Sequence, residues 1–112
     1  MKKWFVLFVL FSFPALAQFL PGTEDIPLIA GLKNVEETAS FDNPSERMVL
    51  ISAETKLSSK KISSFYKQTL NNLGWQEIRP NFFKRGNDTF FIEITSSSST
   101  NQVQFRLSQS NS

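Results

Sequence analysis

The chain has 112 residues, and neither histidine nor cysteine occurs among them. Without imidazole or thiol groups it cannot form a Ser-His-Asp triad, a cysteine nucleophile or a zinc site of the usual Cys/His kind. The length suits one domain, which must be held together by core packing alone because no disulfide can form.

The first 17 residues predict a secretory signal peptide. Lys2 and Lys3 precede an apolar run from Trp4 to Phe13, and Ala15-Leu16-Ala17 has the small-x-small pattern of a cleavage site. The run is about half of the ~20 residues that a membrane-spanning helix needs. We therefore expect cleavage after Ala17 and a periplasmic mature chain with no stable membrane anchor. The loss of the two lysines leaves 10 basic and 10 acidic residues, so the charge predicts no nucleic-acid partner.

Residues 18–46 are predicted to form an extended arm that lies on the domain. Prolines and glycines interrupt any helical or strand period there. Residues 26–32 are nevertheless too apolar for a free tail.

Residues 47–108 are predicted to form the folded domain, beginning with a strand at 47–55. Ser58 or Ser59 is expected to cap a helix, and Gly74 stands where a helix favours a left-handed residue after its end. Between these limits the apolar stripe has a period of 3.6 residues and comprises Ile62, Phe65, Tyr66, Thr69, Leu70 and Leu73.

Four short strands are expected after the helix, at 75–79, 82–85, 88–95 and 102–107. Gly86-Asn87 is a two-residue hairpin signal, 96–101 is predicted to be a flexible polar loop, and 109–112 a disordered tail. The predicted fold is α+β with the order β-α-β-β-β-β, a two-layer sandwich of one amphipathic helix on a meandering antiparallel sheet.

The helix can cover only one face of that sheet, and we assign Phe83, Arg85, Phe91 and Arg106 to the other as a candidate interaction face. Aromatic and arginine side chains on a sheet are similar to a base-stacking surface, but export argues against RNA. Three explanations stay open for this face: cover by the arm or by self-association, an envelope protein, or a small apolar ligand.

Two further segments carry a resemblance. The arm contains Asp25-Ile26-Pro27-Leu28 followed by Gly31-Leu32, and the helix ends in Phe65-Tyr66, Leu70 and Gly74-Trp75. This combination of D-I-P-L-x-x-G-L and F-Y-x-x-x-L-x-x-x-G-W resembles small exported periplasmic proteins of alphaproteobacteria, whose function is unknown. The resemblance implies a fold and a compartment, and no catalytic residue.

Enzymatic chemistry is not expected, and neither is a metal or a cofactor. The remaining carboxylate pairs, Glu24/Asp25 and Glu36/Glu37, lie in the arm of a domain too small for a cleft. We expect a non-enzymatic exported protein-interaction or envelope-assembly module. The alternative is a carrier for a small apolar or lipid-like ligand.

Overall fold

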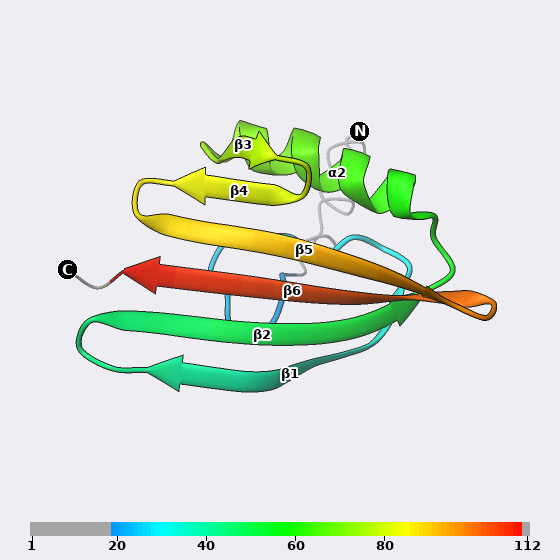
Figure 1. The fold of residues 1–112 in the computed structure, drawn as a ribbon, viewed down its shortest axis with the longest axis horizontal. Coiled ribbons are helices and arrows are strands. Elements are labelled where there is room, and N and C mark those ends of the chain that lie inside the picture. The colour runs from blue at the N-terminus through cyan, green and yellow to red at the C-terminus, as the bar shows by residue number, and fades with distance from the viewer. Residues whose placement is uncertain (1–18, 111–112) are drawn as a thin grey trace, which may run out of the picture.

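The computed structural model describes residues 19–110, so the predicted signal peptide and the last two residues lie outside it. The elements in chain order are β1 (Leu32–Asp42), β2 (Glu46–Thr55), α2 (Ser59–Asn72), β3 (Gln76–Arg79), β4 (Phe82–Arg85), β5 (Asp88–Ser97) and β6 (Thr100–Ser110). The strands form one open antiparallel sheet in the order β1-β2-β6-β5-β4-β3 (Figure 1). The predicted α+β class is confirmed.

The helix has the predicted limits, each fixed by a local interaction. The Ser58 side chain accepts a hydrogen bond from the backbone N–H of Lys61 at 3.1 Å, which satisfies one of the donors left free at a helix start. At the other end Gly74 has φ +93°, a conformation that glycine adopts without steric cost. Ile62, Tyr66 and Leu70 are the fully buried helix residues.

The core lies on one face of the sheet and receives side chains from three sources. Helix α2 lies beside β3 and β4, while the arm passes behind β6 and β2 (Figure 1). The largest buried side chains come from the helix, the turn after it and the sheet: Tyr66, Leu70, Trp75, Phe83, Phe90 and Phe105. Tyr66 contacts Phe105 edge to face, with ring centroids 5.4 Å apart, and the arm contributes Leu20, Ile26 and Ile29.

The predicted element order lacked one strand. Residues 32–42 form β1, an edge strand that pairs with β2 from Leu32↔Thr55 to Asp42↔Arg47. Most of its side chains are exposed on both faces, and register shifts interrupt the pairing twice. A strand of this kind shows no alternation of apolar and polar residues, which is why the sequence indicated only an irregular arm.

The predicted loop at 96–101 and the predicted tail were also wrong in part. β5 and β6 continue through Ser96↔Asn101 and Ser97↔Thr100 to a turn at residues 98–99. At its other end β6 pairs with β2 as far as Glu46↔Ser110. Backbone pairing holds these polar strand ends together with side-chain hydrogen bonds: Asn101 donates to the carbonyl of Leu57, and Gln109 accepts from Arg47.

Candidate functional site

The arm crosses the same face as the helix, and one buried hydroxyl group holds it there. The Tyr66 hydroxyl donates a hydrogen bond to the backbone carbonyl of Pro27 at 2.9 Å and accepts one from the backbone N–H of Ile29 at 3.3 Å. Burial raises the pKa of Tyr66 well above its ordinary value, and the hydrogen bond from Ile29 lowers it by a smaller amount. Of the explanations left open for the second face, cover by residues 26–32 is excluded, because this segment packs against the core on the helix side.

An ion pair fixes the same segment a few residues earlier. Arg85 Nη1 lies 3.0 Å from Asp25 Oδ2 and donates to the carbonyl of Leu73 at the helix end, also at 3.0 Å. The guanidinium carbon lies 4.5 Å from the centroid of the Trp75 ring. Arg85 thus joins arm, helix end and sheet, which is a structural role.

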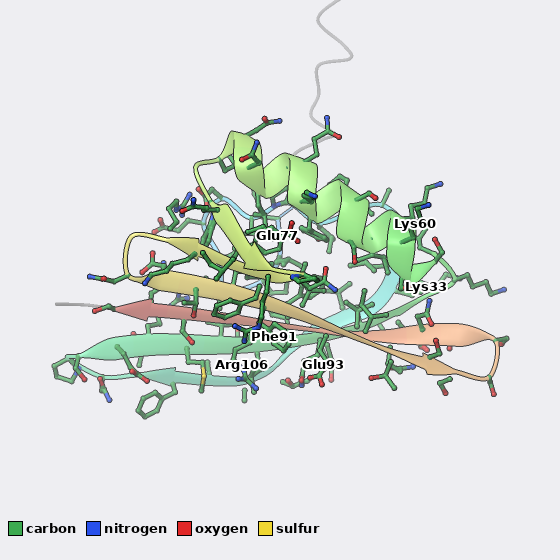
Figure 2. The ribbon with its side chains drawn as sticks, turned by 45° about the horizontal axis from the view of Figure 1, so that its top comes forward. Lys33, Lys60, Glu77, Phe91, Glu93 and Arg106 are labelled. Atoms are coloured by element: carbon green, nitrogen blue, oxygen red, sulfur yellow. The ribbon has the colours of Figure 1, made fainter. Side chains whose placement is uncertain are left out.

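The four residues assigned to the candidate interaction face do not share a face. Phe83 is 1% exposed and pairs with Phe90 in the core, and Arg85 contacts the arm. Phe91 and Arg106 are cross-strand partners on the opposite, open face; in Figure 2 they lie close together, with Glu93 nearby. The structure therefore keeps Phe91 and Arg106 together and places Phe83 and Arg85 on the helix side.

Phe82, and not Phe83 as predicted, lies on the same face as Phe91. It pairs with Phe91, their ring centroids 6.1 Å apart and the rings inclined at 64°. The guanidinium of Arg79 lies 4.3 Å from the centroid of the Phe82 ring. Both phenylalanines are half-buried, so part of each ring is accessible to a partner.

These residues belong to a row of cross-strand neighbours that runs over the whole open face. From one edge to the other the row consists of Arg79, Phe82, Phe91, Arg106, Leu50 and Ala39. No other segment between residues 19 and 110 covers it, since helix and arm both lie on the opposite side. We call this surface the open face.

The charged residues of the open face are distributed unevenly across the sheet. By register, the outward basic residues towards the β3 edge are Arg79 and Lys84, and Arg106 lies near the centre. The outward acidic residues are Glu36, Glu46 and Glu54 on β1 and β2, with Glu93 on β5. Lys33 on β1 also faces outward, opposite Glu54. The open face therefore has a net positive charge on β3 and β4 and a net negative charge on β1 and β2.

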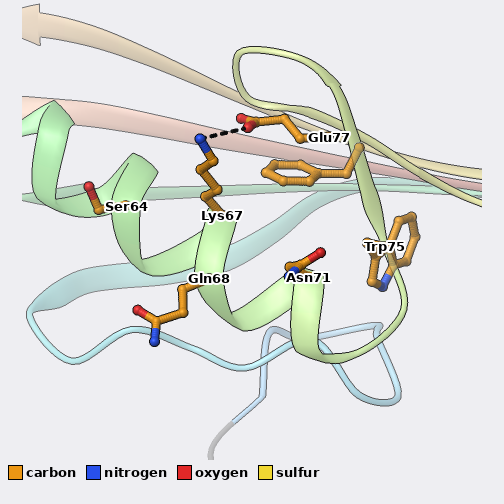
Figure 3. A pocket seen from close by; sticks show the side chains of 7 residues that line it. Ser64, Lys67, Gln68, Asn71, Trp75 and Glu77 are labelled. Carbon is orange, nitrogen blue, oxygen red and sulfur yellow. Dashed lines mark ion pairs between the residues drawn. The ribbon is translucent and has the colours of Figure 1, made fainter.

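The two larger of the surface hollows beside the helix have the following linings. The first has a volume of about 470 Å³ and is lined by Ser64, Lys67, Gln68, Asn71, Trp75, Glu77 and Phe83; the Lys67–Glu77 ion pair, 3.7 Å long, spans it (Figure 3). The indole N–H of Trp75 is buried without a hydrogen-bond partner in the part of the chain that the structure describes. The second, of about 480 Å³, is mainly apolar and is lined by Ile29, Ala30, Leu57, Lys61, Ser64, Phe65 and Gln68.

The carboxylates of the arm do not converge. Asp25 is paired with Arg85, and Glu36 and Glu37 point to opposite faces because they pair with Ser52 and Ile51. Among residues 19–110 no cluster of three carboxylates could hold a metal ion, and no helix there is long and apolar enough to cross a membrane.

No protein-family model, curated protein or solved structure matches this chain. Membership of the alphaproteobacterial group therefore stays a prediction. The residues of the motifs behind it make structural contacts that join the arm to the core. They are Asp25 and Pro27 in the arm, Tyr66 in the middle of the helix and Trp75 just after it.

Proposed function

We propose that the protein is a non-enzymatic, exported interaction module that binds another protein through the open face of its sheet. The observation that carries the proposal is the position of the arm. Because the arm lies with the helix, the Phe82–Phe91 pair and its two arginines remain accessible on the other side. Accessible apolar surface bordered by polar groups is typical of protein interaction sites.

The composition of the open face supports a protein partner over a small molecule. Aromatic residues and arginine are enriched among the residues that contribute most to protein–protein binding. The central row of the open face contains both kinds, and the Arg79–Phe82 stacking holds one arginine over a ring. An open sheet surface of this sort offers area, whereas a small ligand needs a concave site that encloses it.

The compartment in this proposal comes from the N-terminal residues. The Lys2-Lys3 pair, the apolar run and the Ala15-Leu16-Ala17 site are the features of an export signal. In the periplasm a layered α+β module with one uncovered face would act as an assembly or adaptor element of the envelope.

A pull-down from envelope extracts tests this function. The wild-type chain, Phe91→Asp and the control Ser59→Asp are compared; the control adds the same charge at the exposed start of the helix, away from the open face. We expect wild type and Ser59→Asp to recover the same partner and Phe91→Asp to lose it. Circular dichroism should show that all three proteins are folded. Equal recovery by all three would remove the open face from the interaction.

A carrier of a small apolar or lipid-like ligand is the second candidate, and the hollow lined by Ile29, Leu57 and Phe65 favours it. The buried, unpartnered Trp75 indole beside the other hollow is a second indication, because a ligand oxygen there would satisfy it. Native mass spectrometry separates the two functions: a hydrophobic molecule bound in stoichiometric amount supports the carrier, and a ligand-free chain refutes it.

A further inference from the structure

The charge layout of the open face makes the surface complementary to itself. Arg79 and Lys84 give the β3 side a net positive charge, while Glu36, Glu46 and Glu54 outnumber Lys33 on the β1 side. The aromatic pair lies on β4 and β5. A partner that fits this surface has negative charges opposite β3 and positive charges opposite β1. A second copy of the chain, turned by 180°, presents this arrangement.

We infer that the open face binds a second copy of this chain, face to face, about a two-fold axis that runs along the strands between β6 and β5. The inference rests on the proposed function and names its partner. Such an axis places β3 over β1 of the second copy, β4 over β2 and β5 over β6, because the strand order is β1-β2-β6-β5-β4-β3.

The register shows which side chains this axis brings together. Phe82 lies over Leu50 of the second copy, and Phe91 lies over Arg106, which suits an aromatic–cation contact. Lys84 lies over Met48, one outward residue from Glu46 of the second copy. The strands of two sheets packed face to face cross at about 30°. Long side chains such as lysine and glutamate can bridge the offset between residues that this angle produces.

The two edges of the sheet are matched in the same way. Arg79 on β3 lies over Ala39 of the second copy, one outward residue from Glu36. An axis perpendicular to the strands through the central row would instead set every strand over its own copy and Arg106 over Arg106. The charges therefore select the axis along the strands.

The area of the open face is sufficient for a stable pair. Six strands about 4.8 Å apart, with outward residues about 6.8 Å apart along each strand, give roughly 700 Å² per copy after allowance for the two short strands. Specific protein interfaces bury about 800 Å² per partner. Under the proposed axis the four-residue strands β3 and β4 cover only part of β1 and β2. The buried area is therefore below this average, towards the lower end of the range for specific interfaces.

Charge reversal at Lys84 and Glu46 tests the inference. In one copy these residues lie on β4 and β2 with two strands between them and are one outward position apart along the strands. The separation is about 16 Å, so they cannot pair within a molecule. Across the proposed interface they are neighbours. Both are exposed, and substitution at either position leaves the core intact.

Sedimentation equilibrium of the purified protein over a range of concentrations gives the dimer dissociation constant for wild type, Lys84→Glu, Glu46→Lys and the double variant. We expect the wild-type chain to form a dimer. Each single variant should raise the dissociation constant about ten-fold, because it places like charges together at two symmetric sites. The double variant should return the dissociation constant to near the wild-type value.

Three outcomes overturn the inference. A chain that is monomeric at every concentration excludes the second copy, and the open face then keeps its proposed function only if the Phe91→Asp pull-down loses a different protein. A dimer insensitive to both single reversals is held elsewhere, for example by the exposed edge of β1. A double variant that stays as weak as the single variants excludes the proposed axis.

Discussion

Replacement of Tyr66 by phenylalanine tests whether one buried hydroxyl group holds the arm on the helix side of the sheet. The change removes a single oxygen atom and keeps the ring, so the edge-to-face contact with Phe105 is retained. What is lost is the hydrogen bond to the carbonyl of Pro27 and the one from the N–H of Ile29.

The cost follows from the burial of these groups. Ile29 is 7% exposed, so water does not readily replace the hydroxyl at its N–H, and a buried donor without a partner costs about 1–3 kcal/mol. The Pro27 residue is partly exposed, and its carbonyl can bind water at little cost. We expect Tyr66→Phe to lower the free energy of unfolding by about 2 kcal/mol, which is roughly 8–16 °C in Tm for a domain of this size.

The pH dependence gives a second measurement on the same group. Burial raises the pKa of Tyr66 in the folded state, whereas in the unfolded chain it ionises near pH 10. Above that pH the unfolded chain has lost a proton that the folded chain keeps, so the free energy of unfolding falls by up to about 1.4 kcal/mol per pH unit until the folded group also ionises. Tyr66→Phe should lack this component.

Urea titration at neutral pH and at several alkaline values measures both effects. Tyr66 is the single tyrosine of the chain, so the near-ultraviolet absorbance of tyrosinate reports this group alone. Two results would refute the proposed attachment of the arm. One is tyrosinate that appears near pH 10 while the protein is still folded. The other is a variant whose free energy of unfolding is within about 0.5 kcal/mol of the wild-type value, because that difference is smaller than the cost of an unsatisfied buried group.

Three other predictions concern the core, the two faces and export. Leu70→Ala and Phe105→Ala should each cost about 2–5 kcal/mol in urea unfolding, the usual range for such changes in a packed interior; near-wild-type stability would contradict helix-on-sheet packing. Phe83→Asp should unfold the domain, because it buries an unpaired charge, whereas Phe91→Asp should leave circular dichroism and Tm nearly unchanged; equal effects would mean that the faces are wrongly assigned. The exported protein should begin at the residue after Ala17, and N-terminal sequencing that finds Met1 would exclude cleavage.

Local patterns in the sequence were sufficient for the elements whose geometry is local. The helix limits followed from a cap at Ser58 or Ser59, of which the structure uses Ser58, from a stripe of period 3.6 and from Gly74. Capping and left-handed backbone involve residues close in the chain. The inward residues of β6 followed from strict alternation, and Val103, the first of them, is buried as expected.

The error at Phe83 was avoidable from the sequence. A two-residue turn at Gly86-Asn87 pairs Arg85 with Asp88, and counting back along both strands pairs Phe83 with Phe90. Because Phe90 was assigned to the core, Phe83 had to lie there too. Adjacent phenylalanines at 82 and 83 hide the alternation, so only the register distinguishes them.

The α+β class, the helix and the hairpin were predictable from the sequence, because these depend on backbone preferences and periodicities within a few residues. The course of the N-terminal segment, in contrast, depends on long-range contacts. Residues 32–42 join the sheet edge as a strand without an apolar pattern, and residues 26–29 turn to the helix side. The Tyr66 hydroxyl bonds to Pro27 and Ile29, 39 and 37 residues away in the chain. A contact between residues so distant in sequence leaves no local periodic signal, yet it fixes which face of the sheet stays open.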